Sequence, residues 1–222
     1  MTNYTIEPFE TLDESIQQEI NHFTRRVNFK KGEILFTNGE LNRYFYVIQK
    51  GKIKIYQLNL ESAKEQTIFI LREGDMFDTI TLLDGEVHDV MYEAMEETEA
   101  FEMPIENVRH LIQSNPDFNR RFFPYLAKQM RHMEELVTDI SLYSTEERLI
   151  KLLLQNLDPN NILKYNLLQG LSNTEIAKLL GTVRHVVERH LKKLKKDGLI
   201  EGKSKILQID NANQLLEKIK LF

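Results

Sequence analysis

The spacing of apolar residues changes from a helical period to a strand period and back along the chain. Residues 8–24 carry an apolar residue at every third or fourth position, which predicts a short amphipathic helix. Between residues 25 and 104, runs rich in β-branched and aromatic residues alternate with turn residues, and residues 65–77 and 90–104 each predict a strand pair. Short strands spaced by about 8–12 residues favour a small antiparallel barrel or jelly roll.

The helical period returns after Pro104. Residues 105–116 predict a short helix, and residues 117–143 predict a long one. Apolar residues in the long helix alternate at spacings of three and four, which is the pattern of a two-stranded coiled coil. We therefore expect a parallel homodimer, with packing of this stripe on the chain's own barrel as the alternative. The stripe consists of Phe123, Leu126, Met130, Met133, Val137 and Ile140.

The last third of the chain begins with a capping box. Ser144 and Glu147 match the Ser-x-x-Glu pattern, in which two side chains satisfy free amides at a helix start. They predict a helix over residues 144–157 and a domain boundary in front of it.

Residues 171–201 predict two helices joined by a tight turn. Ser172 and Glu175 form a second capping box, for a helix of about eight residues. Gly181 follows, where a tight turn needs a residue free of Cβ strain, and a longer helix begins near Thr182. This arrangement is a helix-turn-helix. The second helix is predicted to bury Val183, Val186, Val187, Leu191 and Leu194.

The outward side of the second helix carries side chains suited to a DNA groove, namely Arg184, His185, Glu188 and Arg189. Arginine can donate two hydrogen bonds to guanine and glutamate can accept one from cytosine, each worth about 1–3 kcal/mol of discrimination. Further residues, and a hairpin or wing over residues 199–209, would hold phosphates without reading sequence. The predicted phosphate contacts are Ser172, Thr182, Lys192, Lys193, Lys196 and Lys203. The alternative is an unrelated all-α hairpin with a solvated cationic face.

The charge of the chain is divided unevenly. Its formal net charge is −5, but residues 1–143 hold 15 Lys and Arg against 25 Asp and Glu, whereas residues 144–222 hold 14 against 9. The net charges are therefore −10 and +5. A compact basic module favours contact with a polyanion such as double-stranded DNA, because phosphate neutralisation supplies most non-specific affinity. Solvated lysine-rich helix faces are the alternative.

Composition and motifs exclude several other classes. The chain has no Cys, so it cannot form a disulfide, a thiolate zinc site, a cysteine-ligated iron–sulfur cluster or a catalytic cysteine. It shows neither a basic leader nor an apolar run long enough for a membrane span, so we expect a cytoplasmic protein without membrane contact. Glycine-rich phosphate loops, serine nucleophile elbows and the His-x-His pairs of a cupin-like metalloenzyme are also missing, so we expect no enzyme.

Several segments together resemble the Crp/Fnr family of bacterial transcription regulators. They are FTNGELNRYFYVIQKGKIKIY and REGDMF in the barrel, the long helix, and GTVRHVVERHLKKLKKDGLI in the helix-turn-helix. The resemblance covers nearly the whole chain and implies an α+β fold. Its parts are a jelly roll of the cyclic-nucleotide-binding type with flanking short helices over residues 1–116, a dimerisation helix over 117–143 and a winged helix-turn-helix over 144–222.

The resemblance also implies how such a protein works. Family members bind palindromic operators as homodimers, and RNA polymerase is a further partner of an activator. The resemblance assigns base reading to Arg184, His185, Glu188 and Arg189. The family often has Glu at the position of His185, so the resemblance does not predict the operator sequence.

The resemblance locates an effector segment in the sensor domain. Nucleotide-binding members hold the cyclic phosphate with a short helix beginning near Gly-Glu-Leu and an Arg-Ser pair further on, and both signatures are missing here. Residues 73–108 contain 12 acidic residues and no Lys or Arg, so a buried phosphate would lack a local cation. We therefore expect no binding of cyclic AMP. The aligned effector-pocket residues are Asp78, Thr79, Ile80, His88 and Asp89.

Other effectors stay open at the level of sequence. The lack of cysteine excludes the iron–sulfur branch of the family, but a haem-based sensor of NO, CO or redox state could use a histidine as axial ligand. His88 lies in the effector segment, and His22, His110 and His132 are the other candidates. A divalent cation on the loop aspartates is chemically reasonable, although solvated loop acids are the default. Some family members need no effector at all.

Overall fold

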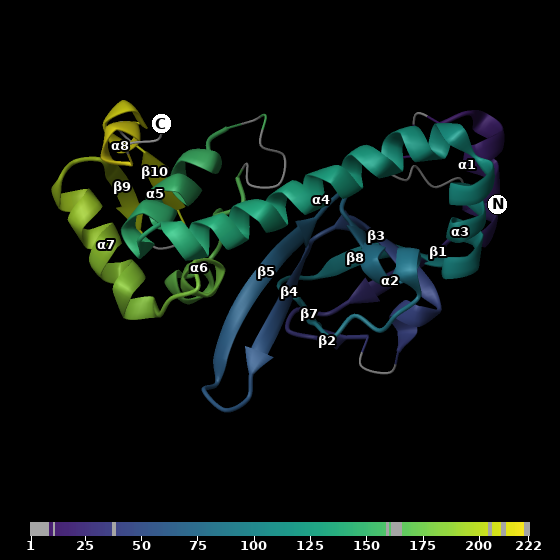
Figure 1. Cartoon of the computed structure of the whole chain (residues 1–222), viewed down its shortest axis with the longest axis horizontal. Coiled ribbons are helices and arrows are strands. Elements are labelled where there is room, and N and C mark those ends of the chain that lie inside the picture. The colour runs from purple at the N-terminus through teal and green to yellow at the C-terminus, as the bar shows by residue number, and fades with distance from the viewer. Residues whose placement is uncertain are drawn as a thin grey trace. The chain divides into compact units, whose positions relative to one another are not determined.

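The structure of the chain is a computed structural model with two compact units (Figure 1). The first unit comprises residues 1–57 and 69–132, and the second comprises residues 58–68 and 133–222. The structure describes residues 9–219 apart from 11, 37–38, 159, 161–165, 204–205 and 210–211.

Two four-stranded sheets make up the β domain, in the orders β1-β8-β3-β6 and β2-β7-β4-β5. Strand β8 runs antiparallel to β1 and β3, and β7 runs antiparallel to β2 and β4. The antiparallel β fold predicted from the strand period is confirmed. The strands are β1 (Arg25–Phe29), β2 (Ile34–Leu35), β3 (Tyr44–Lys50), β4 (Lys52–Asn59), β5 (Lys64–Arg72), β6 (Met76–Phe77), β7 (Met91–Ala94) and β8 (Thr98–Pro104).

The two strand pairs expected at residues 65–77 and 90–104 are not paired within themselves. Strands β5 and β6 belong to different sheets, and so do β7 and β8. In a fold of two packed sheets, consecutive strands can join opposite sheets, and each strand then turns its apolar side toward the shared core. The local period therefore identified the strands but not their partners.

Strand β3 is buried on both sides and separates two cores. Phe45 and Val47 face a cluster shared with the flanking helices, whereas Tyr46 and Ile48 face the interior between the sheets. This alternation is the two-residue period of a strand. Helices α3 and α4 lie close to their predicted spans, α1 begins later than the predicted residue 8, and η1 and α2 were not predicted. The helical elements of this part of the chain are α1 (Glu14–Phe23), the 3-10 turn η1 (Glu40–Asn42), α2 (Thr79–Asp84), α3 (Ile105–Ser114) and the long α4 (Pro116–Leu142).

Aromatic rings fill the interior between the two sheets. Tyr46 and Phe77 stack with ring centroids 5.3 Å apart, and Phe36 lies 4.6 Å from Tyr46. Tyr92 lies 5.5 Å from Phe36 and 5.8 Å from Phe77. These separations are typical of packed aromatic pairs, so the chain's own side chains occupy the centre of the β domain.

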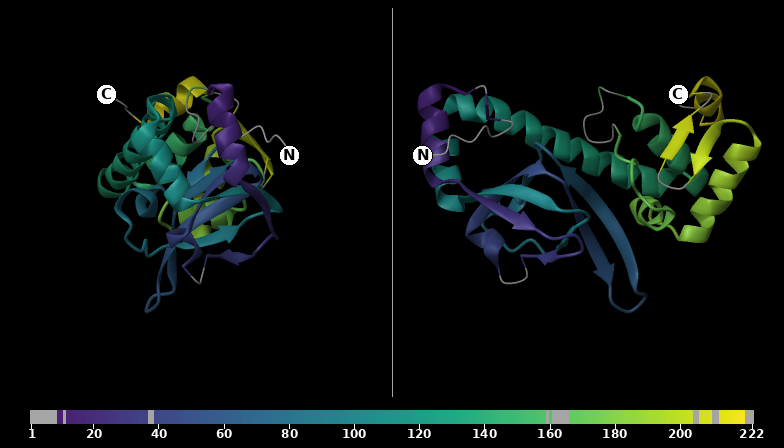
Figure 2. Two further views of the ribbon diagram at one scale, coloured as in Figure 1. Left: turned by 90° about the vertical axis from the view of Figure 1, so that its right-hand side faces the viewer. Right: turned by 180° about the vertical axis from the view of Figure 1, so that it is seen from behind.

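The second unit holds a helix-turn-helix with a wing. Strands β9 and β10 pair antiparallel, with Ile206 opposite Lys203, and form the ribbon beside α7 (Figure 2). This ribbon is the hairpin expected over residues 199–209. The elements are α5 (Thr145–Gln155), α6 (Asn173–Leu179), α7 (Arg184–Lys196), β9 (Ile200–Lys203), β10 (Ile206–Ile209) and α8 (Ala212–Lys218).

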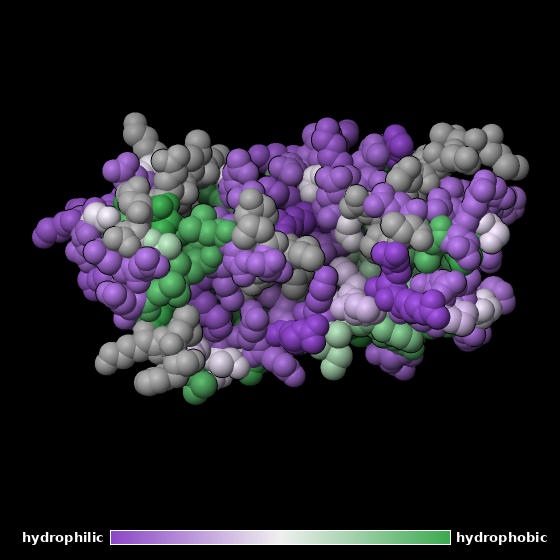
Figure 3. Space-filling model, turned by 90° about the horizontal axis from the view of Figure 1, so that it is seen from above, coloured by the Kyte–Doolittle hydropathy of each residue, from purple (hydrophilic) through white to green (hydrophobic). Residues whose placement is uncertain are grey.

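The surface is mostly hydrophilic on the face shown in Figure 3, where apolar side chains gather mainly over the second unit at the left. Exposed apolar residues of that unit include Val137, Ile140 and Leu157. No helix in the described part of the chain combines the length and apolar character needed to cross a bilayer.

Candidate functional site

The helix-turn-helix is built as its sequence predicts. The Ser172 hydroxyl accepts the Glu175 amide at 3.3 Å, and the Glu175 carboxylate accepts the Ser172 amide at 2.5 Å, which caps α6. Gly181 follows with φ +64°, a left-handed conformation that favours glycine. Helix α7 then begins at Arg184, slightly later than the expected start near Thr182.

One burial prediction in this segment is wrong. Val183 is 47% exposed, because it is the extended N-cap residue of α7, where helical spacing does not apply. Val187, Leu191 and Leu194 are buried as expected, and Val186 is partly buried. The opposite side of α7 is therefore the side that solvent, or DNA, can reach.

The four predicted base-reading residues lie on that solvent side. Arg184, His185 and Arg189 are exposed, and Glu188 is partly exposed. Arg184 Nε donates to Glu188 Oε1 at 2.7 Å, and this hydrogen bond lowers the pKa of the Glu188 carboxyl. The pair presents a guanidinium and an ionised carboxylate side by side. Arg189 forms no ion pair with another residue in the described ranges.

The predicted phosphate contacts differ in their surroundings. Lys192 and Lys196 are exposed, and neither is ion-paired among the residues that the structure describes. Lys193 is also exposed, but its ammonium is bound to Glu146 of α5 at 2.8 Å. Thr182 is partly exposed in the turn between α6 and α7. The lysines of α7 are therefore not equivalent.

Local structure already uses other polar groups around α7. The Ser172 hydroxyl serves the α6 cap, and Lys203 lies on β9, with its side chain outside the described residues. Sequence reasoning missed Lys195, whose ammonium donates to the Gly202 carbonyl and ties the end of α7 to the wing. No local pattern indicates this contact, because the Gly202 carbonyl belongs to β9 and not to the helix itself.

The apolar stripe of α4 is open to solvent in the single chain. Five of its six side chains are between 39% and 68% exposed, and Leu126 packs against the core of the first unit. An aligned apolar stripe of this kind is typical of a surface that another element covers. The five exposed residues are Phe123, Met130, Met133, Val137 and Ile140.

In the β domain, Asp78 and His88 meet at the start of α2. The Asp78 carboxylate is 5% exposed and accepts the Ile80 amide at 3.0 Å and the Thr81 hydroxyl at 2.9 Å. His88 Nδ1 lies 2.8 Å from the same carboxylate. The side chain that caps α2 is therefore held from the following loop as well.

The protonation of this pair follows from its hydrogen bonds. The bond to Asp78 raises the pKa of His88 above its ordinary value of 6.5, against the opposing effect of burial. Burial disfavours ionisation of Asp78, but hydrogen bonds from His88 and Thr81 outweigh it and lower the pKa of the carboxyl. Each group therefore stabilises the charged form of the other.

The other aligned effector residues do not join this pair. Ile80 is 49% exposed, Asp89 is exposed and Thr79 is the partly buried first residue of α2. Across the described ranges, no three His, Asp or Glu side chains come close enough together to hold a metal ion.

The acidic stretch of residues 73–108 is less isolated than the sequence suggests. Cations from neighbouring strands reach three of its carboxylates, and Arg109 of α3 donates to the Thr81 and Leu82 carbonyls of α2. Sequence order hid these partners, because strand pairing brings them from distant positions. The three pairs are Lys54 with Glu93, Arg26 with Glu99 and Arg25 with Glu102.

Two family models match the chain. One is described as a cyclic nucleotide-binding domain and matches residues 26–115, and the other is described as a Crp-like helix-turn-helix domain and matches residues 147–218. Among curated proteins, the chain is 28% identical over 213 residues to the Cyclic AMP receptor protein of Thermus thermophilus, covering 93% of this chain and 92% of that protein. It is 26% identical over 216 residues to the Fumarate and nitrate reduction regulatory protein of Vibrio cholerae, covering 95% and 84%.

A solved structure shares the whole fold. A mutant of CooA from Carboxydothermus hydrogenoformans matches with a TM-score of 0.77 at 23% identity, covering 99% of this chain and 98% of that one. The two matched models coincide with the β domain and with the helix-turn-helix described above. The chain therefore belongs to the Crp/Fnr family of DNA-binding transcription regulators.

Proposed function

We propose that this regulator acts as a homodimer on a palindromic operator and that its sensor domain does not bind cyclic AMP. The observation that carries the proposal is the exposed cationic side of α7 within a winged helix-turn-helix. The protein acts by binding double-stranded DNA rather than by catalysis. RNA polymerase is a further partner if the regulator activates transcription.

Different side chains of α7 contact the bases and the phosphates. Arg189 can form two hydrogen bonds with guanine, and the Arg184–Glu188 pair offers a donor and an acceptor to adjacent bases. Lys192 and Lys196 lie further along the helix and hold phosphates, which fixes the register of the helix in the groove.

The stripe on α4 supports the homodimer. Knobs-into-holes packing of two copies would bury side chains that are up to 68% exposed in the single chain. A parallel two-stranded coiled coil relates its copies by a two-fold axis, and a palindrome has the same symmetry. The two half-sites are then expected about 34–36 Å apart along the DNA.

The Asp78–His88 pair supports a sensor that does not use cyclic AMP. The start of α2 aligns with the phosphate-binding helix of nucleotide-binding family members, and here a buried carboxylate caps it. A phosphate placed there would be repelled by the ionised carboxylate, and the neighbouring His88 ring is already bonded to that carboxylate. An effector-independent regulator, whose activity follows its own concentration, fits these contacts.

A haem-based sensor fits them less well. His88 Nδ1 faces Asp78, and aromatic rings pack the interior between the sheets. A cavity of about 630 Å³ lies between the start of α1 and the first turns of α4, and its lining contains no histidine among the described residues. We therefore assign no haem ligand.

Three measurements on the full-length chain test the proposal. Sedimentation at micromolar concentration is expected to show a dimer, and a monomer would contradict it. DNA affinity is expected to fall steeply with salt, because each phosphate contact adds about −0.9 to the log–log slope. Calorimetry with cyclic AMP is expected to show no binding, and saturable binding would contradict the sensor assignment.

A further inference from the structure

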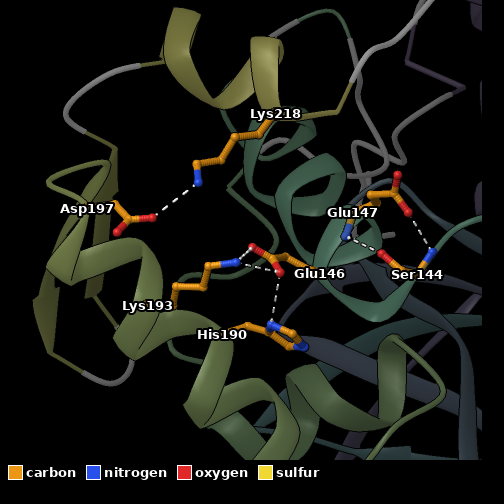
Figure 4. Close-up of polar contacts among 7 residues, drawn as sticks. All are labelled: Ser144, Glu146, Glu147, His190, Lys193, Asp197 and Lys218. Carbon is orange, nitrogen blue, oxygen red and sulfur yellow. Dashed lines mark hydrogen bonds and ion pairs between the residues drawn. The ribbon is translucent and has the colours of Figure 1, made fainter.

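One carboxylate of α5 lies beside two side chains of the recognition helix and binds one of them, Lys193 (Figure 4). The Glu146 oxygens lie 2.8 and 3.1 Å from Lys193 Nζ, and Oε2 lies 3.6 Å from His190 Nδ1. Since His190 and Lys193 are three residues apart, they share one side of α7. That side faces α5, whereas Arg184 and Arg189 are exposed.

The position of Glu146 is set by the helix that carries it. Ser144 and Glu147 form a complete capping box at the start of α5, with hydrogen bonds of 3.3 and 2.7 Å (Figure 4). Lys151 Nζ, one turn further on, contacts Asp139 Oδ1 of α4 at 2.6 Å. Helix α5 is therefore capped at its first turn and tied to the long helix at its second, and Glu146 extends from the first turn to α7.

The charges in this cluster are matched one to one. Burial lowers the pKa of His190, and nearby Arg189 and Lys193 add to the effect, so the imidazole is neutral at pH 7. Among the residues that the structure describes, Lys193 is then the one full positive charge in contact with Glu146, and their hydrogen bond raises the pKa of Lys193. The side chains of Glu146, His190 and Lys193 are 26%, 13% and 54% exposed, so the contact is partly shielded from water.

This pairing changes what Lys193 can contribute to DNA binding. A lysine that neutralises a phosphate releases a counterion, which makes affinity depend on salt. The counterion of Lys193 is the Glu146 carboxylate, which cannot leave. Lys192 is adjacent and exposed, with no ion pair inside the described ranges, so its charge is free to meet a phosphate.

We propose that Glu146 is a positioning residue of the recognition helix. It holds α7 on α5 through Lys193, and it withholds Lys193 from the DNA backbone, so that Lys192 makes the phosphate contact at this level of the helix. The inference rests on the proposed function, because it concerns how α7 meets DNA.

Salt titrations of DNA affinity test this with matched variants of the full-length chain. Lys192→Ala is expected to make the log–log slope shallower by about 0.9, one phosphate contact, whereas Lys193→Ala leaves the slope unchanged. Glu146→Gln frees the Lys193 ammonium, so the slope becomes steeper by up to about 0.9. The double variant Glu146→Gln with Lys193→Ala is expected to return to the wild-type slope.

A second readout does not depend on DNA. Glu146 raises the pKa of His190, so Glu146→Gln is expected to lower the His190 pKa measured by NMR, and Lys192→Ala is expected to shift it much less. Equal slope changes for Lys192→Ala and Lys193→Ala, in a chain that binds its operator, would overturn this inference alone. A wild-type chain that binds no DNA would overturn the proposed function and this inference with it.

Discussion

The first 143 residues and the rest of the chain differ in how their charged side chains are paired. Residues 1–143 carry a net charge of −10, yet several of their acidic side chains are paired with cations from neighbouring strands. Residues 144–222 carry +5, and α7 leaves Lys192, Lys196 and Arg189 exposed on one side. From net charge alone, one would expect residues 1–143 to bind a cationic ligand and residues 144–222 to bind an anionic one. The contacts show instead that pairing decides which charges are available to a partner.

The two regions also differ in how they use apolar side chains. The interior of the β domain is packed with aromatic rings, whereas α4 exposes an apolar stripe along its length. The space between the sheets is filled by the chain itself, whereas the apolar surface of the helix is open, which is the basis for the proposed second copy of the chain. Each prediction below changes one side of this contrast.

The largest effect is expected from Met133→Glu on the stripe. The dimer would bury the new carboxylate without a partner, so we expect monomers and a loss of operator affinity of more than about 100-fold. Leu142→Glu, at an exposed position outside the stripe, is the control and is expected to leave the dimer intact. Sedimentation and footprinting measure both effects, and normal operator protection by Met133→Glu would mean that the stripe is not the interface.

Arg189→Ala is expected to have the next largest effect, on sequence reading. Losing a bidentate contact to guanine costs about 1–3 kcal/mol, roughly 5- to 150-fold in affinity for the operator. Affinity for scrambled DNA is expected to change much less, because the hydrogen bonds that the variant loses are those to the operator bases. Anisotropy titrations on both DNAs separate the two, and an equal loss on both would assign Arg189 to the phosphates.

In the sensor, Asp78→Ala removes the cap of α2 and the partner of His88. We expect the free energy of unfolding to fall by about 1–2 kcal/mol. Asp89→Ala, at an exposed position in the following loop, is the control and is expected to stay within about 0.5 kcal/mol of wild type. Urea unfolding measures both variants, and equal changes would show that the Asp78 contacts do not stabilise the domain.

The smallest effect concerns pH. The pKa of His88 is raised in the folded chain, so its stabilising contribution is complete below the unfolded value near 6.5 and declines as pH rises through the folded value. Compared with wild type, His88→Ala is expected to be less stable by up to about 1 kcal/mol at pH 6, with a smaller difference at alkaline pH. A difference that grew with pH would contradict the charged pair.

Features encoded over a few residues could be predicted from sequence. Both capping boxes form, and α4 spans Pro116–Leu142 against an expected 117–143. Gly181 takes the left-handed conformation that the turn requires. Each of these depends on neighbours within about one or two helical turns, so the local pattern contains the necessary information.

Features that depend on distant residues could not be predicted in this way. Strands β5 and β6 separate into different sheets, and the cations that pair with Glu93 and Glu102 come from strands far away in sequence. The bond between Lys193 and Glu146 could not be predicted either, because Glu146 lies 47 residues earlier. Only packing reveals such contacts, because no periodicity connects the two positions.

Selection of binding sites from random DNA by the full-length chain, with no nucleotide added, tests the central claim most directly. A homodimer that positions two α7 helices is predicted to enrich one palindrome, with half-site centres about 10–10.5 base pairs apart. Enrichment of a single unrepeated half-site, of no sequence at all, or of the palindrome only when cyclic AMP is present would contradict the account.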